Sequence, residues 1–98
     1  MATYITLIRF TEQGSRTIAD TCGRATAFQA SAQSAGITVR DVFWTMGPVD
    51  GVLIFDAPND EAATGAMLSL SSQGNVQTQT CRAFDAGAMQ QVLKNRPQ

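Results

Sequence analysis

The segment from Asp41 to Pro58 constrains the fold of this chain more than any other part of it. It is predicted to form two β-strands joined by a tight corner at Gly47–Asp50, and the only Trp, Trp44, precedes that corner by three residues. Successive side chains of a strand point to opposite faces, and apolar residues occupy both alternating sets here. A sheet with two apolar faces needs a cover on each side.

The remaining sequence alternates between strand-like and helical patterns. Runs of β-branched and aromatic residues predict strands, and apolar residues spaced by three or four predict helices. We predict strands at Thr3–Phe10, Ile37–Met46, Val49–Ala57 and Asn75–Phe84, a turn at Thr11–Ser15, a helix from Arg16 to Gly36, a second helix from Asn59 or Asp60 to Gly74, and a short helix at Ala86–Asn95 capped by Asp85.

Two details of these helices can be tested against a structure. Gly23 is a poor residue for a helix interior, so a kink or break is expected near residues 20–24. The short last helix is expected to bury Met89, Val92 and Leu93, which are spaced for one face.

The element order is β-α-β-β-α-β followed by a helix. This order predicts an α+β fold of the ferredoxin-like type in one domain, residues 1–98, with a four-stranded antiparallel sheet and two helices on one face. The second apolar face then requires either the terminal helix or a second copy of the chain. We favour the second copy, and therefore a homo-oligomer, a dimer or larger, formed through the sheet face.

Composition excludes several classes of partner. The net charge is −1 and the basic residues are scattered, which argues against nucleic acid. The N-terminal residues do not resemble a signal peptide, and no stretch approaches the length of a membrane helix, so we expect a cytoplasmic protein without a membrane partner. Charged residues make up only 15%, which fits either a protein-covered surface or one rich in Ser, Thr and Gln.

The chain contains no His and two Cys. This composition removes Ser-His-Asp and Cys-His catalysis and the usual zinc site, and we predict neither a metal nor a cofactor. In a reducing compartment Cys22 and Cys81 are expected to be free thiols, buried as small apolar side chains.

The chain also resembles a known family, the GYD-domain proteins of the dimeric α+β barrel group. The matching pieces are Thr3-Tyr4-Ile5, the Thr-Glu-Gln-Gly turn, Trp44-Thr45-Met46-Gly47, Asp50, Ala57–Ala63, Gly74-Asn75-Val76 and Arg82-Ala83-Phe84. The family's Gly-x-Tyr-Asp motif reads Gly47-Pro48-Val49-Asp50 here, with Val49 in place of Tyr. The resemblance implies a ferredoxin-like fold and self-association, and implies little about chemistry.

Five residues are candidates for binding a ligand, and each also has a structural interpretation. Asp50 is a possible acid or base beside Val52 and Ile54, or it bonds backbone N–H groups at the turn. Trp44 is a candidate for stacking on a flat ligand, and its structural interpretation is a large aromatic in the core or at an interface. Arg9 and Arg82 bind an acidic ligand or pair with Asp41, Asp50 or Asp56, and Tyr4 donates a hydrogen bond or lies at an interface.

Three functional hypotheses follow. The first is a self-associating protein that binds a small molecule in a cleft beside the hairpin. The second is a cofactor-free enzyme of the oxygenase or isomerase kind that uses Asp50 or Tyr4. The third is a regulatory subunit that docks on another protein through the terminal helix. The missing His favours the first hypothesis over the second.

Overall fold

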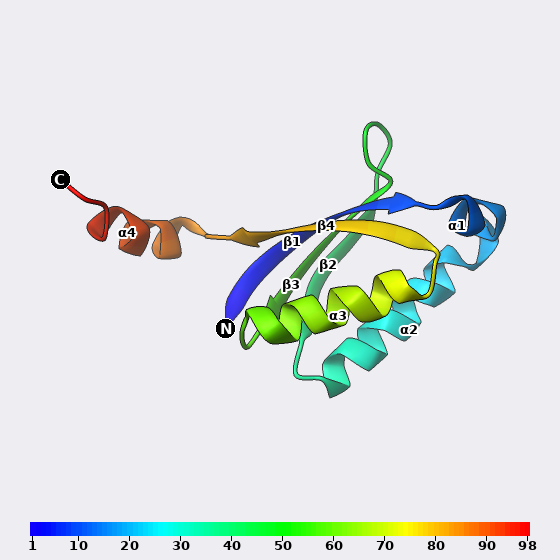
Figure 1. Ribbon diagram of the computed structural model, residues 1–98, viewed down its shortest axis with the longest axis horizontal. Coiled ribbons are helices and arrows are strands. Elements are labelled where there is room, and N and C mark those ends of the chain that lie inside the picture. The colour runs from blue at the N-terminus through cyan, green and yellow to red at the C-terminus, as the bar shows by residue number, and fades with distance from the viewer.

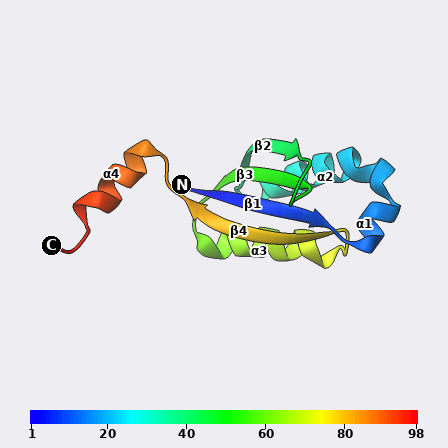
Figure 2. The same cartoon turned by 90° about the horizontal axis from the view of Figure 1, so that it is seen from above.

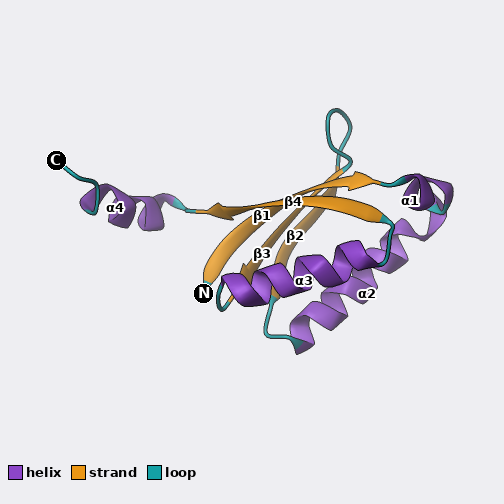
Figure 3. Cartoon of the chain, viewed as in Figure 1, coloured by secondary structure: helices purple, strands orange, loops and turns teal.

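The computed structural model describes residues 1–98 and contains two layers with an appended helix (Figures 1 and 3). Its elements are β1 (Ala2–Phe10), α1 (Glu12–Arg16), a 3-10 turn η1 (Ile18–Asp20), α2 (Thr21–Ser34), β2 (Thr38–Trp44), β3 (Gly51–Ala57), α3 (Asp60–Ser72), β4 (Val76–Ala83) and α4 (Ala86–Lys94). The strands form one antiparallel sheet in the order β2-β3-β1-β4. The predicted α+β, ferredoxin-like architecture with a C-terminal helix is confirmed.

The core lies between the sheet and the two long helices. Helix α2 lies over β2, and α3 lies over β4 and β3, all on the same face of the sheet. In the strand register Tyr4 lies opposite Phe55, and Thr6 lies opposite Leu53. The buried apolar residues come from β1, β3 and the two helices: Tyr4, Ala32, Ile37, Leu53, Phe55, Ala57, Ala63 and Met67. Thr6 is the one buried polar side chain of this layer, and its hydroxyl lies 2.8 Å from that of Thr80.

The opposite face of the sheet carries no helix (Figure 2). Ile5 pairs with Ile54 and Leu7 pairs with Val52 on the two central strands, and Phe43 of β2 lies opposite Val52. These five apolar side chains therefore form one continuous patch, which we call the bare face. The expectation that both faces of the sheet are apolar is confirmed, and only one of them is covered within the chain.

The helix ends follow from local hydrogen bonds. Asn59 and Asp85 cap α3 and α4, because their side chains accept hydrogen bonds from the N–H groups of Ala62 and Ala88, each 2.8 Å long. Gly36 and Gly74 follow α2 and α3 with positive φ angles of 80° and 85°, a conformation that favours glycine. These ends were predicted from the sequence.

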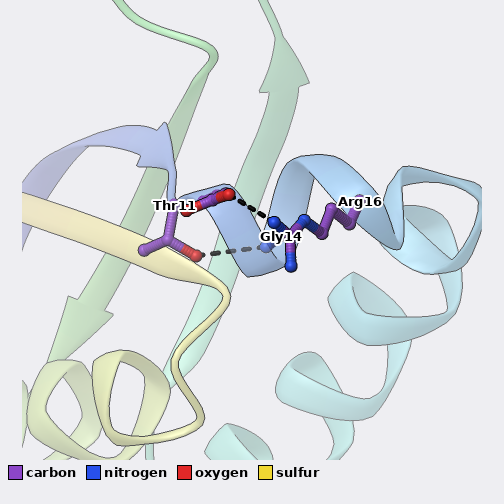
Figure 4. A network of polar contacts seen from close by, with 4 residues as sticks. Thr11, Gly14 and Arg16 are labelled. Carbon is purple, nitrogen blue, oxygen red and sulfur yellow. Dashed lines mark hydrogen bonds and ion pairs between the residues drawn. The ribbon is translucent and has the colours of Figure 1, made fainter.

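The segment predicted as a turn after β1 forms the short helix α1 instead. The Thr11 hydroxyl accepts a hydrogen bond of 3.1 Å from the N–H of Gly14, and Glu12 pairs with Arg16 one turn later (Figure 4). This capped turn is stable because Gly14 is buried against the backbone of Asn75. The break in the first long helix is confirmed, but it lies at the 3-10 turn of Ile18–Asp20, and Gly23 is inside α2.

Helix α4 does not pack on the rest of the chain. It extends beyond the end of β4 (Figures 1 and 2), and none of its residues is buried. Met89, Val92 and Leu93 are 45%, 40% and 44% exposed, so the expectation that they are buried is wrong for the single chain. The helix also leaves the bare face uncovered, because it points along the direction of the strand that precedes it.

No helix is both long and apolar enough to span a bilayer.

Two irregularities mark the β2–β3 hairpin. The register shifts by one residue between Val39 and Asp41, which leaves Arg40 as a bulge on the edge strand. The corner between the strands rises above the sheet on the side away from α2 and α3 (Figure 1). Within this corner the hydroxyl of Thr45 donates to the carbonyl of Val49 at 2.7 Å.

Candidate functional site

A cavity lies between the sheet and α2, at the end of the sheet where the β2–β3 corner begins. It contains about 80 Å³ of solvent-accessible space, whereas one water needs roughly 10–15 Å³ on this measure. Ten of its sixteen lining residues are hydrophobic. The lining residues come from four strands, two helices and their connections: Ile8, Phe10, Thr21, Arg24, Ala25, Phe28, Val42, Phe43, Trp44, Asp50, Gly51, Leu53, Leu70, Gln73, Asn75 and Val76.

Asp50 brings a carboxylate to this apolar cavity. Its Oδ2 accepts a hydrogen bond of 2.8 Å from the N–H of Phe10, and its own N–H donates to the carbonyl of Ile8 at 2.8 Å. The expectation that Asp50 bonds a backbone N–H is confirmed, although the donor lies on β1 and not in the corner. Oδ1 accepts no hydrogen bond from the chain and is therefore free to accept one from another donor, and Asp50 is a lining residue of the cavity.

Alternation along the strand was expected to place Asp50 on the same face as Val52 and Ile54. That expectation is wrong, because Asp50 precedes the regular part of β3 and lines the cavity on the helix side with Leu53. The hydrogen bonds to β1 turn the backbone at this point, and the period of two does not extend through a corner.

Trp44 forms one wall of the cavity at the edge strand. Its indole Nε1–H donates to the hydroxyl of Thr21 at 3.0 Å, which joins β2 to the first residue of α2. The indole ring is thereby held in one orientation, and it remains half exposed at the cavity wall. A fixed and partly open aromatic surface is suited to stacking on a flat molecule.

Arg24 of α2 is a cavity residue that the sequence did not reveal. Its Nη1 donates to the carbonyl and hydroxyl of Thr17, at 3.0 and 2.9 Å, and its Nη2 lies 3.4 Å from the carbonyl of Gly14. No carboxylate pairs with it, so its hydrogen-bond partners are two backbone carbonyls and one hydroxyl, all of them uncharged. The helical period places Arg24 on the inner face with Ala25 and Phe28, and this polar residue within an apolar pattern was the available signal.

Tyr4 and Arg82 lie in a different place, an open groove between α3 and β4. The Tyr4 hydroxyl donates to the carboxylate of Asp60, and the Arg82 guanidinium lies over the rings of Tyr4 and Phe84 at 5.8 and 5.4 Å. The groove has a volume of about 430 Å³ and also contains Thr80 in its lining. The hydrogen bond to Asp60 raises the pKa of Tyr4, because the ionised phenol would face that carboxylate without a shared proton.

The five predicted site residues therefore do not form one site. Trp44 and Asp50 share the cavity, Tyr4 and Arg82 share the groove, and Arg9 lines neither of them. The expected ion pairs of Arg9 and Arg82 with aspartates are also wrong. The pair to a strand aspartate is made by Arg40 and Asp56, 3.7 Å apart, because the bulge places Arg40 within reach.

The two thiols are free, as predicted, but both are exposed, so the expectation that they are buried is wrong. Cys22 lies in the first turn of α2, outside the inner stripe of the helix. Cys81 lies on the edge strand β4 opposite Ile5, on the bare side of the sheet. No three Cys, Asp or Glu side chains approach one another closely enough to hold a metal ion.

Comparison with known proteins agrees with this architecture. The protein TTHA0845 of Thermus thermophilus, known from a crystal structure, is similar over 88% of this chain and 96% of its own, with a TM-score of 0.57 and 24% sequence identity, which shows a shared fold. No curated protein matches the sequence. The family model described as the GYD domain matches residues 4–93, which includes β2, β3, β4 and all but the first two residues of β1. The chain therefore belongs to the GYD domain family.

Proposed function

We propose that this chain binds a small, mostly apolar molecule that carries a hydrogen-bond donor, in the cavity beside Trp44 and Asp50. The observation that supports the proposal most is the free Oδ1 of Asp50 on the wall of a cavity whose other walls are mainly hydrophobic. Binding pockets commonly combine an apolar lining with a few fixed polar groups that orient the ligand. Asp50 is such a fixed group, because its other oxygen is held by Phe10.

The contacts around the cavity favour a flat ligand such as an aromatic alcohol. Trp44 is held by Thr21, and Phe28 approaches from α2, so a planar ring has apolar surfaces available on two elements. A hydroxyl on that ring would donate to Asp50, and Arg24 supplies a positive charge to any oxygen that bears negative charge.

The geometry disfavours the enzymatic alternative that uses Asp50 or Tyr4, whether singly or together. Tyr4 lies in the separate groove between α3 and β4, and its hydroxyl already donates a hydrogen bond to Asp60. The two groups therefore cannot act on one small substrate. Asp50 alone offers a carboxylate but no partner acid in the cavity, so binding is the function that this arrangement supports best.

The proposal can be tested by titrating the full chain with phenol and, separately, with anisole, which keeps the ring but lacks the donor. The single Trp gives one indole N–H signal in a ¹H–¹⁵N spectrum. We expect phenol to shift this signal at lower concentration than anisole, by about tenfold, because one hydrogen bond to a charged group is lost with anisole.

Asp50→Ala should remove the preference for phenol, whereas Asp41→Ala, an exposed carboxylate on β2 outside the cavity, should keep it. Equal responses to phenol and anisole in the unmodified chain would contradict the role of Asp50. An indole signal that neither compound moves would contradict binding in this cavity.

We also propose that the chain self-associates through the bare face. Leaving Ile5, Leu7, Val52, Ile54 and Phe43 in water forgoes roughly 25 cal/mol for each Å² of apolar surface. A second copy of the chain brings an identical patch, as a two-fold symmetric pair requires.

Sedimentation analysis of the full chain should show a dimer or larger at micromolar concentration. Val52→Lys, in the centre of the patch between Leu7 and Phe43, should shift the population to monomer, whereas Gln77→Lys, on the same side of the sheet but on the edge strand, should not. A monomeric unmodified chain at 100-fold higher concentration would refute self-association.

A further inference from the structure

The α4 arm, which we define as residues 86–98, is the most prominent feature that neither proposal above explains. It stretches the molecule to 52 Å along one axis against 31 Å along the next. The radius of gyration is 14.8 Å, whereas a compact chain of about 100 residues has roughly 13 Å. A helix that contributes no buried residue to its own chain gains nothing from tertiary packing.

The arm nevertheless has a surface suited to packing. Met89, Val92 and Leu93 are spaced for one side of the helix and all are exposed. Where β4 leads into α4, the chain also forms an open hollow of about 560 Å³ lined by Phe84, Ala88 and Val92 among others. The arm therefore presents both an apolar stripe and a concavity that no element of the same chain fills.

The distribution of charge points to the occupant. The arm carries two cations, Lys94 and Arg96, and no acid, a net charge of +2. Residues 1–85 carry five cations and eight acids, a net charge of −3. The arm of one chain is therefore electrostatically complementary to the body of another copy of the same chain.

The size of the bare face supports the same occupant. The bare face consists of five apolar side chains on three strands. Each partner in a complex of standard size contributes roughly 20–30 residues and about 800 Å². The bare face alone supplies fewer residues than that, and the arm is a further exposed apolar surface that a partner copy could cover.

We propose that the α4 arm packs on a second copy of this chain, reciprocally, and thereby completes the dimer that the bare face begins. This inference rests on the self-association proposed above. Two-fold symmetry makes the exchange mutual, so each arm contact occurs twice. Asp85, which caps α4, and Phe84 are the only residues between β4 and the arm, and this short connection keeps α4 directed away from its own body.

The direct test mixes equal amounts of chain labelled with ¹³C in the methyl groups of Met, Leu and Val with unlabelled chain. Isotope-filtered NOE spectra then report only contacts between different copies. We expect such contacts from the methyl groups of Met89, Val92 and Leu93. Signals from Leu7 and Val52 alone would show a dimer without arm exchange, which overturns this inference and leaves self-association standing. A monomeric sample overturns both.

A variant in the full chain provides an independent measurement. Met89→Gln/Leu93→Gln should raise the dissociation constant of the dimer at least tenfold, because the helix packs on nothing within its own chain and the fold is retained. Gln90→Ala, outside the apolar stripe of the same helix and without a change of charge, is the matched control and should change it less than twofold. An unchanged dissociation constant in the double variant overturns the inference.

A lipid surface is the competing occupant of a basic amphipathic helix. Vesicles of phosphatidylserine and phosphatidylcholine should not dissociate the dimer or sediment with the chain. Vesicle binding that depends on Met89 and Leu93, with no contacts between copies in the NOE spectra, would assign the arm to lipid and overturn the inference.

Discussion

The carboxylate of Asp50 accepts a hydrogen bond of 2.8 Å from the main-chain N–H of Phe10, which ties the β2–β3 corner to the end of β1. The same residue joins β1 a second time through its N–H and the carbonyl of Ile8. Asp50 thus holds the corner against β1 beside the cavity through its side chain and its main chain, and its Oδ1 remains without a hydrogen bond from the chain.

Asp50→Ala should lower the free energy of unfolding by about 1–3 kcal/mol, because the N–H of Phe10 loses its charged acceptor. Asp50→Asn should cost less, since an amide oxygen can still accept the bond. Urea denaturation measures both, with Asp41→Ala as a control for removing an exposed carboxylate. Equal stability of Asp50→Ala and the unmodified chain would show that the bond contributes nothing to folding.

Two glycines in the helical region should respond in opposite directions to alanine. A Cβ at Gly14 would lie 2.0 Å from the carbonyl oxygen of Asn75, so Gly14→Ala should destabilise the fold by about 3 kcal/mol or more. A Cβ at Gly23 meets nothing within 4 Å, so Gly23→Ala should stabilise α2 by about 1 kcal/mol. Thermal unfolding followed by circular dichroism distinguishes the two. Similar effects of both changes would contradict the close approach of α1 to Asn75.

Tyr4 should titrate above its ordinary pKa, because its hydroxyl donates to Asp60 in the folded chain. It is the only Tyr, so the ultraviolet absorbance of phenolate reports it alone. The pKa in the unfolded chain is about 10. Above that pH the unfolded chain binds fewer protons than the folded one, and stability falls as pH rises toward the folded-state pKa of Tyr4.

Asp60→Asn should bring the titration of Tyr4 back toward its ordinary midpoint, and Tyr4→Phe should flatten the loss of stability in this pH range. A midpoint that is the same in the folded chain and in denaturant would contradict the hydrogen bond.

Removal of the two helix caps should destabilise different parts of the fold. Asn59→Ala removes the cap of α3, which packs on the sheet, and should lower the stability of the whole fold by about 1 kcal/mol. Asp85→Ala removes the same kind of bond from α4 but should increase amide exchange only within that helix, because no residue of α4 is buried in the chain. Faster exchange throughout β1 in Asp85→Ala would show that α4 does pack on its own body.

The sequence was sufficient for the order of the four strands and of α2, α3 and α4, for the apolar bare face and for most helix ends. These features depend on local signals: alternation, three-or-four spacing, a capping Asn or Asp, and a glycine after the helix. Helix α1 was missed because its five residues include Gly14 and Ser15, which are weak helix formers, and its stability comes from the distant backbone of Asn75.

The candidate site was predicted only in part, because it depends on distances between elements. Trp44 and Asp50 line one cavity, whereas Tyr4 and Arg82 line a separate groove between α3 and β4. Because of the bulge, Arg40 forms an ion pair with Asp56, whereas the sequence had led us to expect such a pair from Arg9 or Arg82. The periodicity of a single strand does not indicate a bulge. It also does not indicate the angle at which a hairpin corner meets a neighbouring strand.

The bulge on β2 has one more consequence, which concerns how far the sheet can grow. The register shift and the exposed charge of Arg40 interrupt that edge, which disfavours the alignment of a further strand along it. The opposite edge, β4, is unbroken from Val76 to Ala83. A fibril built by strand addition needs an accepting edge on both sides of the sheet. The bulge on β2 therefore disfavours such growth and leaves association to the face of the sheet, where the number of copies is limited by the surface they share.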